Sequence, residues 1–266
     1  NINLGQCYFG LGQIEKAISS YTKVTKYQPT WAIGFTMLGQ IHSLQENPDQ
    51  AIDNFKKALN LLPDDYDLNF TLGTELFQND DIDEAITYLE KALAQEPNSS
   101  ATLTMLGGAS NRKADHKLAM SYYKQALVLD PKDEKLHFNI GNALQAEDSF
   151  DAAIASYQRA LKIKPDDAEV YQNMGIAFKA KGAFDAAIAS FKKAIEIKPE
   201  NVEAYNSLGS SLYKKGDLKE AIESFQQAIE IKPAYAPAYN NIFFPLQAIK
   251  SGSVTVENQF SSLAVS

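Results

Sequence analysis

The chain has 266 residues, of which 45% are hydrophobic, and its formal net charge is -8. Such an acidic chain lacks the basic face that general binding to nucleic acid or to anionic membranes requires. No apolar run is long enough to insert into a membrane, and no signal peptide is visible. The single cysteine, Cys7, excludes an internal disulfide and a zinc site built from cysteines. This composition leaves the compartment open and favours a soluble, cytoplasmic protein.

Proline recurs through most of the chain at a constant step of 34 residues, at Pro29, Pro63, Pro97, Pro131, Pro165, Pro199 and Pro233. Glycine lies 24 residues before each proline, at Gly5, Gly39, Gly73, Gly107, Gly141, Gly175 and Gly209. Alanine lies 12 residues before each proline, at Ala17, Ala51, Ala85, Ala119, Ala153, Ala187 and Ala221. A fixed period of this length indicates a stacked array of repeats, in which each repeat contacts only its neighbours.

These glycines, alanines and prolines make residues 1–235 similar to tetratricopeptide repeat proteins. The resemblance implies an all-α fold, a right-handed α-solenoid or superhelix of helix–turn–helix repeats. The repeats are 1–31 (incomplete), 32–65, 66–99, 100–133, 134–167, 168–201 and 202–235. Because Asn1 falls at the fourth position of its repeat, we expect the chain to be a piece of a longer protein.

Each repeat predicts two helices, A and B, with apolar residues at helical spacing. The small glycine of helix A and alanine of helix B should allow a close approach of the two helices. Asn47 is predicted to cap a helix that begins with Pro48. Carboxylates at Asp83, Asp151 and Asp185 lie near the positive end of a helix dipole, which indicates a capping role.

The repeat 100–133 departs most from the pattern, whereas those from 134 to 235 are nearly uniform. Its helix A contains a second glycine, Gly108, beside the packing glycine Gly107, and a glycine inside a helix costs about 1 kcal/mol relative to alanine. Ser110 stands where other repeats have an aromatic residue or leucine. The repeat is either a tolerated, degenerate one or a hinge where a ligand backbone can come close. In both cases we expect it to be the softest interior repeat.

After the last repeat, residues 236–250 are predicted to form a degenerate capping helix. Pro245 should stop that helix, because proline removes a backbone hydrogen bond and clashes with the preceding turn. We therefore expect a short helix over 236–244 whose Tyr239, Ile242 and Phe243 cover the open end of the array. The tail, 251–266, is not polar, and we expect its Val254, Val256 and Phe260 to dock on the protein's own repeats or in the groove of a neighbouring copy.

No pattern of catalysis or metal binding is visible. His42, His116 and His137 are scattered without ligand spacing, and Cys7 has no base beside it in the sequence. The glycines occur singly at packing positions, so no phosphate-binding loop is predicted. We therefore expect no catalytic residue, no metal site and no cofactor, and we do not expect the array to be an enzyme.

The resemblance implies that helix A lines a concave groove. The 100° step of a helix turns positions two, five, six, nine and thirteen of each repeat away from the core. The predicted peptide-binding residues at these positions are Asn3, Gln6, Met37, Gln40, Phe70, Thr71, Met105, Phe138, Asn139, Asn142, Gln172, Asn173, Asn206 and Ser207. Positions five, six and nine contain no basic residue, which argues against the carboxylate clamp that some family members use.

The asparagines at position six, Asn139, Asn173 and Asn241, are similar to the asparagine ladder in the repeat arm of O-linked N-acetylglucosamine transferase, from which Ser207 departs. An amide can pair with an extended peptide backbone whatever its sequence. The alternative is that asparagine is merely a common surface residue at this position.

The resulting hypothesis is a non-catalytic protein–protein interaction scaffold that binds an extended peptide or an unstructured segment. A second hypothesis is the substrate-recruiting arm of a larger enzyme, of glycosyltransferase or sulfotransferase type, whose catalytic domain is absent. A third is self-assembly into a homo-oligomer through the end faces or the C-terminal tail.

Overall fold

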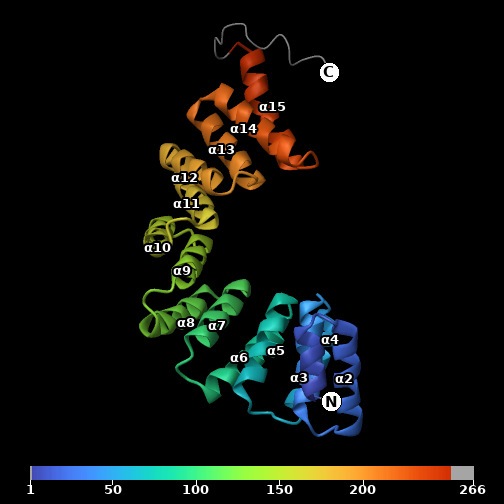
Figure 1. Cartoon of the computed structure of the whole chain (residues 1–266). Coiled ribbons are helices and arrows are strands. Elements are labelled where there is room, and N and C mark those ends of the chain that lie inside the picture. Colours follow the sequence, from blue (N-terminus) through green and yellow to red (C-terminus); the bar gives the residue numbers. More distant parts are fainter. Residues whose placement is uncertain (1, 253–266) are drawn as a thin grey trace. The chain divides into compact units, whose positions relative to one another are not determined.

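The computed structural model describes residues 2–252, and within them every regular element is an α-helix (Figure 1). This confirms the predicted all-α fold. The helices are α1 (Ile2–Gly10), α2 (Ile14–Tyr27), α3 (Ala32–Leu44), α4 (Pro48–Leu59), α5 (Tyr66–Gln78), α6 (Ile82–Gln95), α7 (Ser100–Arg112), α8 (His116–Leu129), α9 (Glu134–Ala146), α10 (Phe150–Ile163), α11 (Ala168–Ala180), α12 (Phe184–Ile197), α13 (Val202–Lys215), α14 (Leu218–Ile231) and α15 (Ala236–Lys250).

The chain divides into two compact units, one ending at Lys132 and the other beginning at Asp133. We call them the N-terminal unit and the C-terminal unit and describe each by itself. In both units the odd-numbered helices up to α13 are the first helices of repeats and the even-numbered ones are the second. Each second helix packs on the first helix of its own repeat and, within its unit, on the first helix of the next.

The packing glycine of each repeat lies directly against a ring or a leucine of the second helix. A Cβ built on Gly39 would lie 2.7 Å from the ring of Phe55, and one on Gly209 would lie 2.7 Å from the ring of Phe225. The rings of Tyr123 and Tyr157 stand as close to Gly107 and Gly141. The prediction that this glycine permits the close approach of the two helices is therefore confirmed.

The turn between the two helices of a repeat also follows the 34-residue period. The same position of every repeat has a positive φ, at Gly12 (69°), Glu46 (57°), Asp80 (68°), Ala114 (59°), Asp148 (55°), Gly182 (75°) and Gly216 (99°). Three of the seven are glycine, which adopts this conformation without steric cost, while the other residues are held there with strain.

Helix caps and charges hold the ends of the elements. Asp167 accepts hydrogen bonds from the backbone N–H groups of Glu169 and Val170 at the start of α11. Asn47 stands at the N-cap of α4, but its side chain makes no capping hydrogen bond, so that prediction is wrong in its detail. The exposed carboxylate oxygen of Asp185 lies 2.9 Å from Nζ of Lys215, on the first helix of the next repeat.

Similar ion pairs join Asp83 to Lys113 and Asp151 to Lys181, the residues that directly follow α7 and α11. These carboxylates therefore connect successive repeats as well as lying in the first turns of their helices. Exposed ion pairs of this kind contribute little individually.

The repeat 100–133 keeps its regular helix. α7 is continuous across Gly107 and Gly108, and Ser110 is buried, with its hydroxyl donating to the carbonyl oxygen of Leu106 at 2.8 Å. A Cβ on Gly108 would lie 3.6 Å from the ring of Phe77, an ordinary van der Waals distance. That this is the softest interior repeat stays a prediction.

The prediction that Pro245 stops the last helix is wrong. α15 continues through Pro245 to Lys250, and it packs on α13 and α14. Pro245 and Ala238 are buried, and Ile242 contacts the core around Phe225. Because this burial stabilises the helix, it offsets the hydrogen bond that the proline removes.

The residues that cover the end of the array also differ from the expectation. Tyr239 and Phe243 are 49% and 58% exposed, so of the three predicted covering side chains Ile242 alone packs against the core. Val254, Val256 and Phe260, predicted to dock on protein, lie outside the described residues.

Candidate functional site

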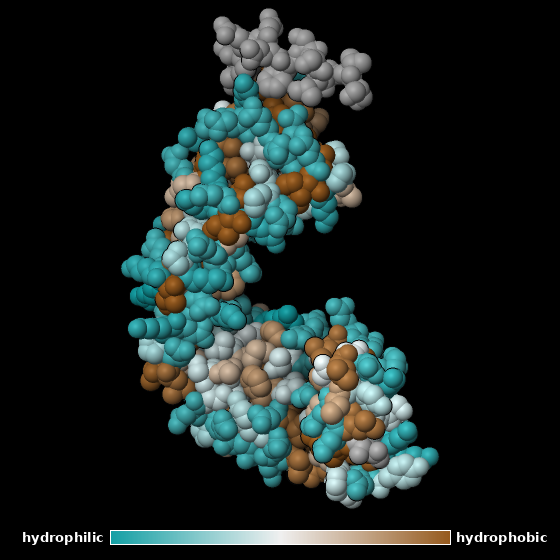
Figure 2. Space-filling model, in the orientation of Figure 1, coloured by the Kyte–Doolittle hydropathy of each residue, from teal (hydrophilic) through white to brown (hydrophobic). Residues whose placement is uncertain are grey.

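The first helices of successive repeats lie side by side within a unit. α9 contacts α11, α11 contacts α13, and α13 contacts α15, while α5 contacts α7 in the N-terminal unit. We call the face that these helices present the first-helix surface. Each residue predicted to bind a peptide is exposed or half-buried, and none is fully buried. The face seen in the space-filling view is largely hydrophilic, with apolar patches in both units (Figure 2).

In the C-terminal unit the predicted amides make hydrogen bonds to one another. Nδ2 of Asn173, on α11, donates to Oδ1 of Asn142, on α9, at 3.2 Å. The same oxygen accepts a hydrogen bond from the hydroxyl of Tyr157 on α10, at 2.7 Å. Asn142 thus receives bonds from both neighbouring helices, and its orientation is fixed before any ligand arrives.

Two further bonds continue this pattern toward the end of the chain. Nδ2 of Asn241 donates to Oδ1 of Asn206 at 2.9 Å, which joins α15 to α13. Nδ2 of Asn201 donates to Oε1 of Gln172 at 2.7 Å. Asn139 has no hydrogen-bond partner among the described residues. The predicted amides are thus partly used inside the protein, which the sequence pattern did not indicate.

The apolar members of the predicted set are also partly used inside the units. Met37 packs against the core around Tyr21, and the ring of Phe138 lies 6.0 Å from the ring of Tyr157. The ring of Phe70 stacks on Tyr66 at 5.9 Å. These side chains are half-buried, so each offers a part of its surface to a ligand.

The N-terminal unit has a pocket of about 490 Å³ between α3, α4 and α5. Two predicted residues, Gln40 and Thr71, line it together with Thr36 and the exposed side chain of Ile33. Two carboxylates also line it: Asp65 lies directly before α5, and Asp67 lies in the first turn of that helix. The structure therefore brings Gln40 and Thr71 together.

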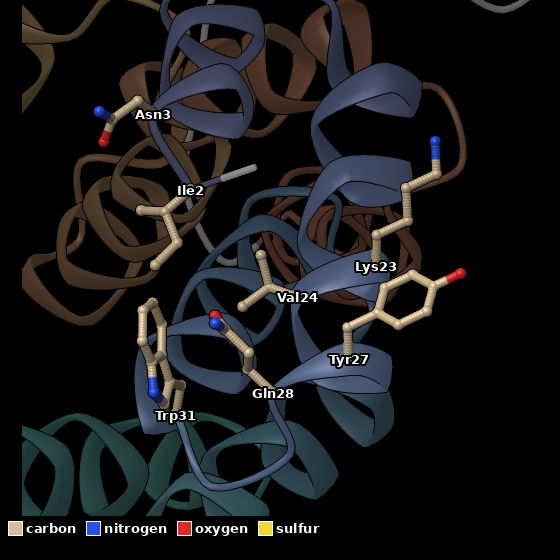
Figure 3. A pocket seen from close by; sticks show the side chains of 7 residues that line it. All are labelled: Ile2, Asn3, Lys23, Val24, Tyr27, Gln28 and Trp31. Carbon is tan, nitrogen blue, oxygen red and sulfur yellow. The ribbon is translucent and has the colours of Figure 1, made fainter.

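A second pocket of the N-terminal unit, about 510 Å³, lies between α1, α2 and the start of α3. Figure 3 shows the side chains of Ile2 and Trp31 pointing toward each other, with Gln28 beside Trp31, while the predicted residue Asn3 points away. Trp31 is 47% exposed. The side chain of Asn3 therefore points in a different direction from the apolar side chains beside it.

The C-terminal unit has a pocket of about 590 Å³ that lies between α11, α13 and α15 and extends to the start of α12. Its described lining consists of Lys179, Phe184, Ser210, Tyr213, Lys214, Phe225, Asn241 and Phe244. We call it the lysine–aromatic pocket. The two lysines stand at positions twelve and thirteen of their repeats. A search for basic residues at positions five, six and nine misses them, although reading the last turn of each helix A would have found them.

Side chains capable of chemistry are dispersed among the described residues. His137 is buried, while Nδ1 of His116 lies 2.7 Å from Oδ1 of Asn111. Within residues 2–252, no three histidine, cysteine or acidic residues are grouped as a metal site would need. Over the same part of the chain, no helix combines the length and the apolar character that crossing a membrane requires.

Comparison with protein families gives matches over most of the chain. The family model of the Cilia and flagella-associated protein 70 C-terminal domain matches residues 33–238. A tetratricopeptide repeat model matches residues 1–30. The repeat pattern and the family comparison therefore agree.

Among curated proteins, a segment of 74 residues is 40% identical to the BBSome complex member BBS4 of Mus musculus. It covers 27% of this chain and 14% of that protein, so most of the relative has no counterpart here.

Among solved structures, the APC/C hetero-tetramer Cut9–Hcn1 has a TM-score of 0.71 at 18% identity, over 91% of this chain and 48% of that one. YrrB, described as a TPR protein with an unusual peptide-binding site, has a TM-score of 0.56 at 22% identity, over 70% of this chain and 96% of that one. At these identities the likeness establishes the fold.

Proposed function

The chain belongs to the family of the Cilia and flagella-associated protein 70 C-terminal domain, a family of tetratricopeptide repeats, and we propose that it is a scaffold that binds an extended segment of a partner protein along its first-helix surface. Tetratricopeptide repeats serve protein–protein interaction, and the similar structure YrrB is described as having a peptide-binding site. The extended conformation of the ligand and its place on the first helices are our proposal.

The observation that carries the proposal is the set of oriented amides in the C-terminal unit. Oδ1 of Asn142 accepts two hydrogen bonds, so its amino group is left with no partner among the described residues. Asn173 uses its amino group as a donor and keeps its oxygen as an acceptor. An extended peptide offers one N–H and one C=O at each residue, which such amides can bind in either direction.

Because these amides are already held in place, binding a ligand would cost little additional side-chain entropy of the amides. Asn139, on α9, adds an amide with no internal partner in the described part of the chain.

A selection of random peptides tests the proposal. The full chain is panned against a phage library of dodecapeptides, and a selected peptide is synthesised. We expect hydrogen exchange to show protection of α9, α11 and α13 by this peptide. We expect Asn139→Ala to weaken its binding about fivefold, since one lost hydrogen bond is worth on the order of 1 kcal/mol.

The matched control is Gln158→Ala, which removes an exposed amide from α10, the second helix of the same repeat. We expect this variant to bind as the unaltered chain does. A peptide that protects the second helices, or that is equally sensitive to both substitutions, would show that the partner binds elsewhere.

A further inference from the structure

The lysine–aromatic pocket carries positive charge, although the chain as a whole is acidic. Its described lining has two lysines, Lys179 and Lys214, and no aspartate or glutamate. The pocket of the N-terminal unit that contains Gln40 is lined by Asp65 and Asp67 instead. On a chain of net charge -8, a positive pocket attracts a negatively charged ligand group to that one place.

These two lysines lack the partners that nearby lysines have. Lys181 pairs with Asp151, and Lys215 pairs with Asp185 and Asp217. Lys179 and Lys214 have no ion pair or hydrogen bond with any described residue. Lys179 is half-buried, and burial lowers the pKa of its ammonium group. A desolvated cation without a counter-ion is unfavourable, so a carboxylate that enters the pocket would relieve that cost.

The remaining walls are aromatic. Phe184 and the buried Phe225 lie in the lining, and the ring of Tyr213 lies 6.3 Å from the ring of Phe244. Phe244 is 51% exposed, so a large apolar side chain is in contact with water at this site. Asn241 and Ser210 supply neutral polar groups beside it. An apolar side chain of a ligand would find contact area here, and a backbone amide would find partners.

We propose that the lysine–aromatic pocket binds a partner segment in which a bulky apolar side chain lies next to a carboxylate, so that the scaffold selects acidic, aromatic peptides. This inference deepens the proposed function and rests on it. The aromatic walls contact the apolar side chain, and the ammonium groups of Lys179 and Lys214 bind the carboxylate. Specificity arises because a ligand without the carboxylate leaves Lys179 desolvated and unpaired.

Three synthetic octapeptides with blocked termini test the pocket on the full chain. The first has phenylalanine followed by glutamate in a background of glycine and serine. In the second, glutamine replaces the glutamate, and in the third, alanine replaces the phenylalanine. Calorimetric titration should show that each replacement weakens binding about tenfold, as expected for a charge-assisted hydrogen bond or a buried aromatic anchor.

The variant Lys179→Met keeps the apolar stem and removes the charge. We expect it to bind the glutamate and glutamine peptides within about twofold of each other, because the coupled pair is lost. The matched control is Lys162→Met, which removes from α10 an exposed lysine that forms no ion pair with a described residue; it should keep the tenfold preference.

The proposal is overturned if none of the peptides binds at millimolar concentration, or if glutamate and glutamine peptides bind the unaltered chain equally. Equal binding together with protection of α9, α11 and α13 by a selected dodecapeptide would reject this pocket and leave the proposed function standing. If no peptide protects or binds the first helices, both the pocket proposal and the proposed function are rejected.

Discussion

The side-chain amide of Asn173 donates a hydrogen bond to the amide oxygen of Asn142, 3.2 Å away on the preceding first helix of the same unit. Tyr157 donates to that same oxygen from the second helix between them. One carboxamide therefore links three consecutive helices and also faces the first-helix surface. Since we propose that this side chain also binds the ligand, the effect of a substitution on stability must be separated from its effect on binding.

Substitution of two asparagines at the same repeat position separates them. Asn173→Ala should lower the free energy of unfolding by about 1 kcal/mol, because it removes an internal hydrogen bond. Asn139→Ala should change it by less than about 0.5 kcal/mol, because Asn139 has no internal partner among the described residues. Urea unfolding of the full chain measures both. Equal losses from the two substitutions would mean that the Asn142 bond contributes nothing measurable.

The fold could be predicted because the packing of each repeat requires particular residue types at fixed positions. The ring of Phe191 occupies the space that a Cβ on Gly175 would need. The packing therefore requires a glycine at one position and a ring sixteen positions later. A capping helix over 236–250 was predicted, but its continuation through Pro245 was not, because local preference and burial compete there. The cost of a proline in a helix is visible in the sequence, whereas the burial of Pro245 and the core that Ile242 contacts are visible only in three dimensions.

The candidate site was less predictable for a similar reason. Helical geometry identified side chains that turn away from the core, and Asn139 and Gln40 do so. It could not show that Asn142 and Asn173 bond to each other across helices, because that depends on the spacing of two neighbouring repeats. The basic side of the C-terminal pocket lies outside positions five, six and nine, because Lys179 stands at position twelve and Lys214 at position thirteen.

The adjacent glycines of α7 should respond in opposite ways to the same substitution. Gly107→Ala places a Cβ against the ring of the buried Tyr123, and overpacking of this kind costs about 1–3 kcal/mol. Gly108→Ala places its Cβ 3.6 Å from the ring of Phe77 and should stabilise the helix by about 1 kcal/mol.

Thermal and urea unfolding distinguish these outcomes. Hydrogen exchange of the Gly108→Ala variant should also show slower opening of α7, if the extra glycine is the reason for a soft repeat. A destabilised Gly108→Ala variant would instead indicate that this position needs the absence of a side chain.

The turns offer a second matched pair. Ala114 is exposed and has a φ of 59°, a conformation that costs an L-residue about 1–2 kcal/mol. Ala114→Gly should raise the free energy of unfolding by roughly 0.5–1 kcal/mol, since the greater freedom of glycine in the unfolded chain offsets part of the relieved strain.

Gly182→Ala is the reverse change at the equivalent turn. Apart from the residue itself and its two chain neighbours, no described residue has an atom within 4 Å of this Cβ position, so any loss of stability comes from the backbone alone. We expect a loss of about 1 kcal/mol in urea unfolding. If both substitutions are neutral, the turn can adopt another backbone conformation without cost.

Tyr157 links the stability of the C-terminal unit to alkaline pH. Burial raises the pKa of its hydroxyl well above the usual value, while in the unfolded chain the group titrates near pH 10. Above pH 10 the unfolded state therefore loses this proton while the folded state keeps it. The folded state then binds more protons, so the free energy of unfolding decreases as the pH rises through this range.

Tyr157→Phe isolates this effect, because phenylalanine occupies the equivalent position at Phe191 and Phe225 and has no proton to lose. At neutral pH we expect the variant to be about 1 kcal/mol less stable, since the hydrogen bond to Asn142 is lost. Above pH 10 the difference should shrink by up to about 1.4 kcal/mol per pH unit and then reverse. Urea unfolding of both proteins between pH 8 and pH 11 measures the difference. The other buried tyrosines affect both proteins equally, so their contributions cancel. A difference that stays constant across this range would show that the hydroxyl of Tyr157 ionises as readily in the folded protein as in the unfolded chain.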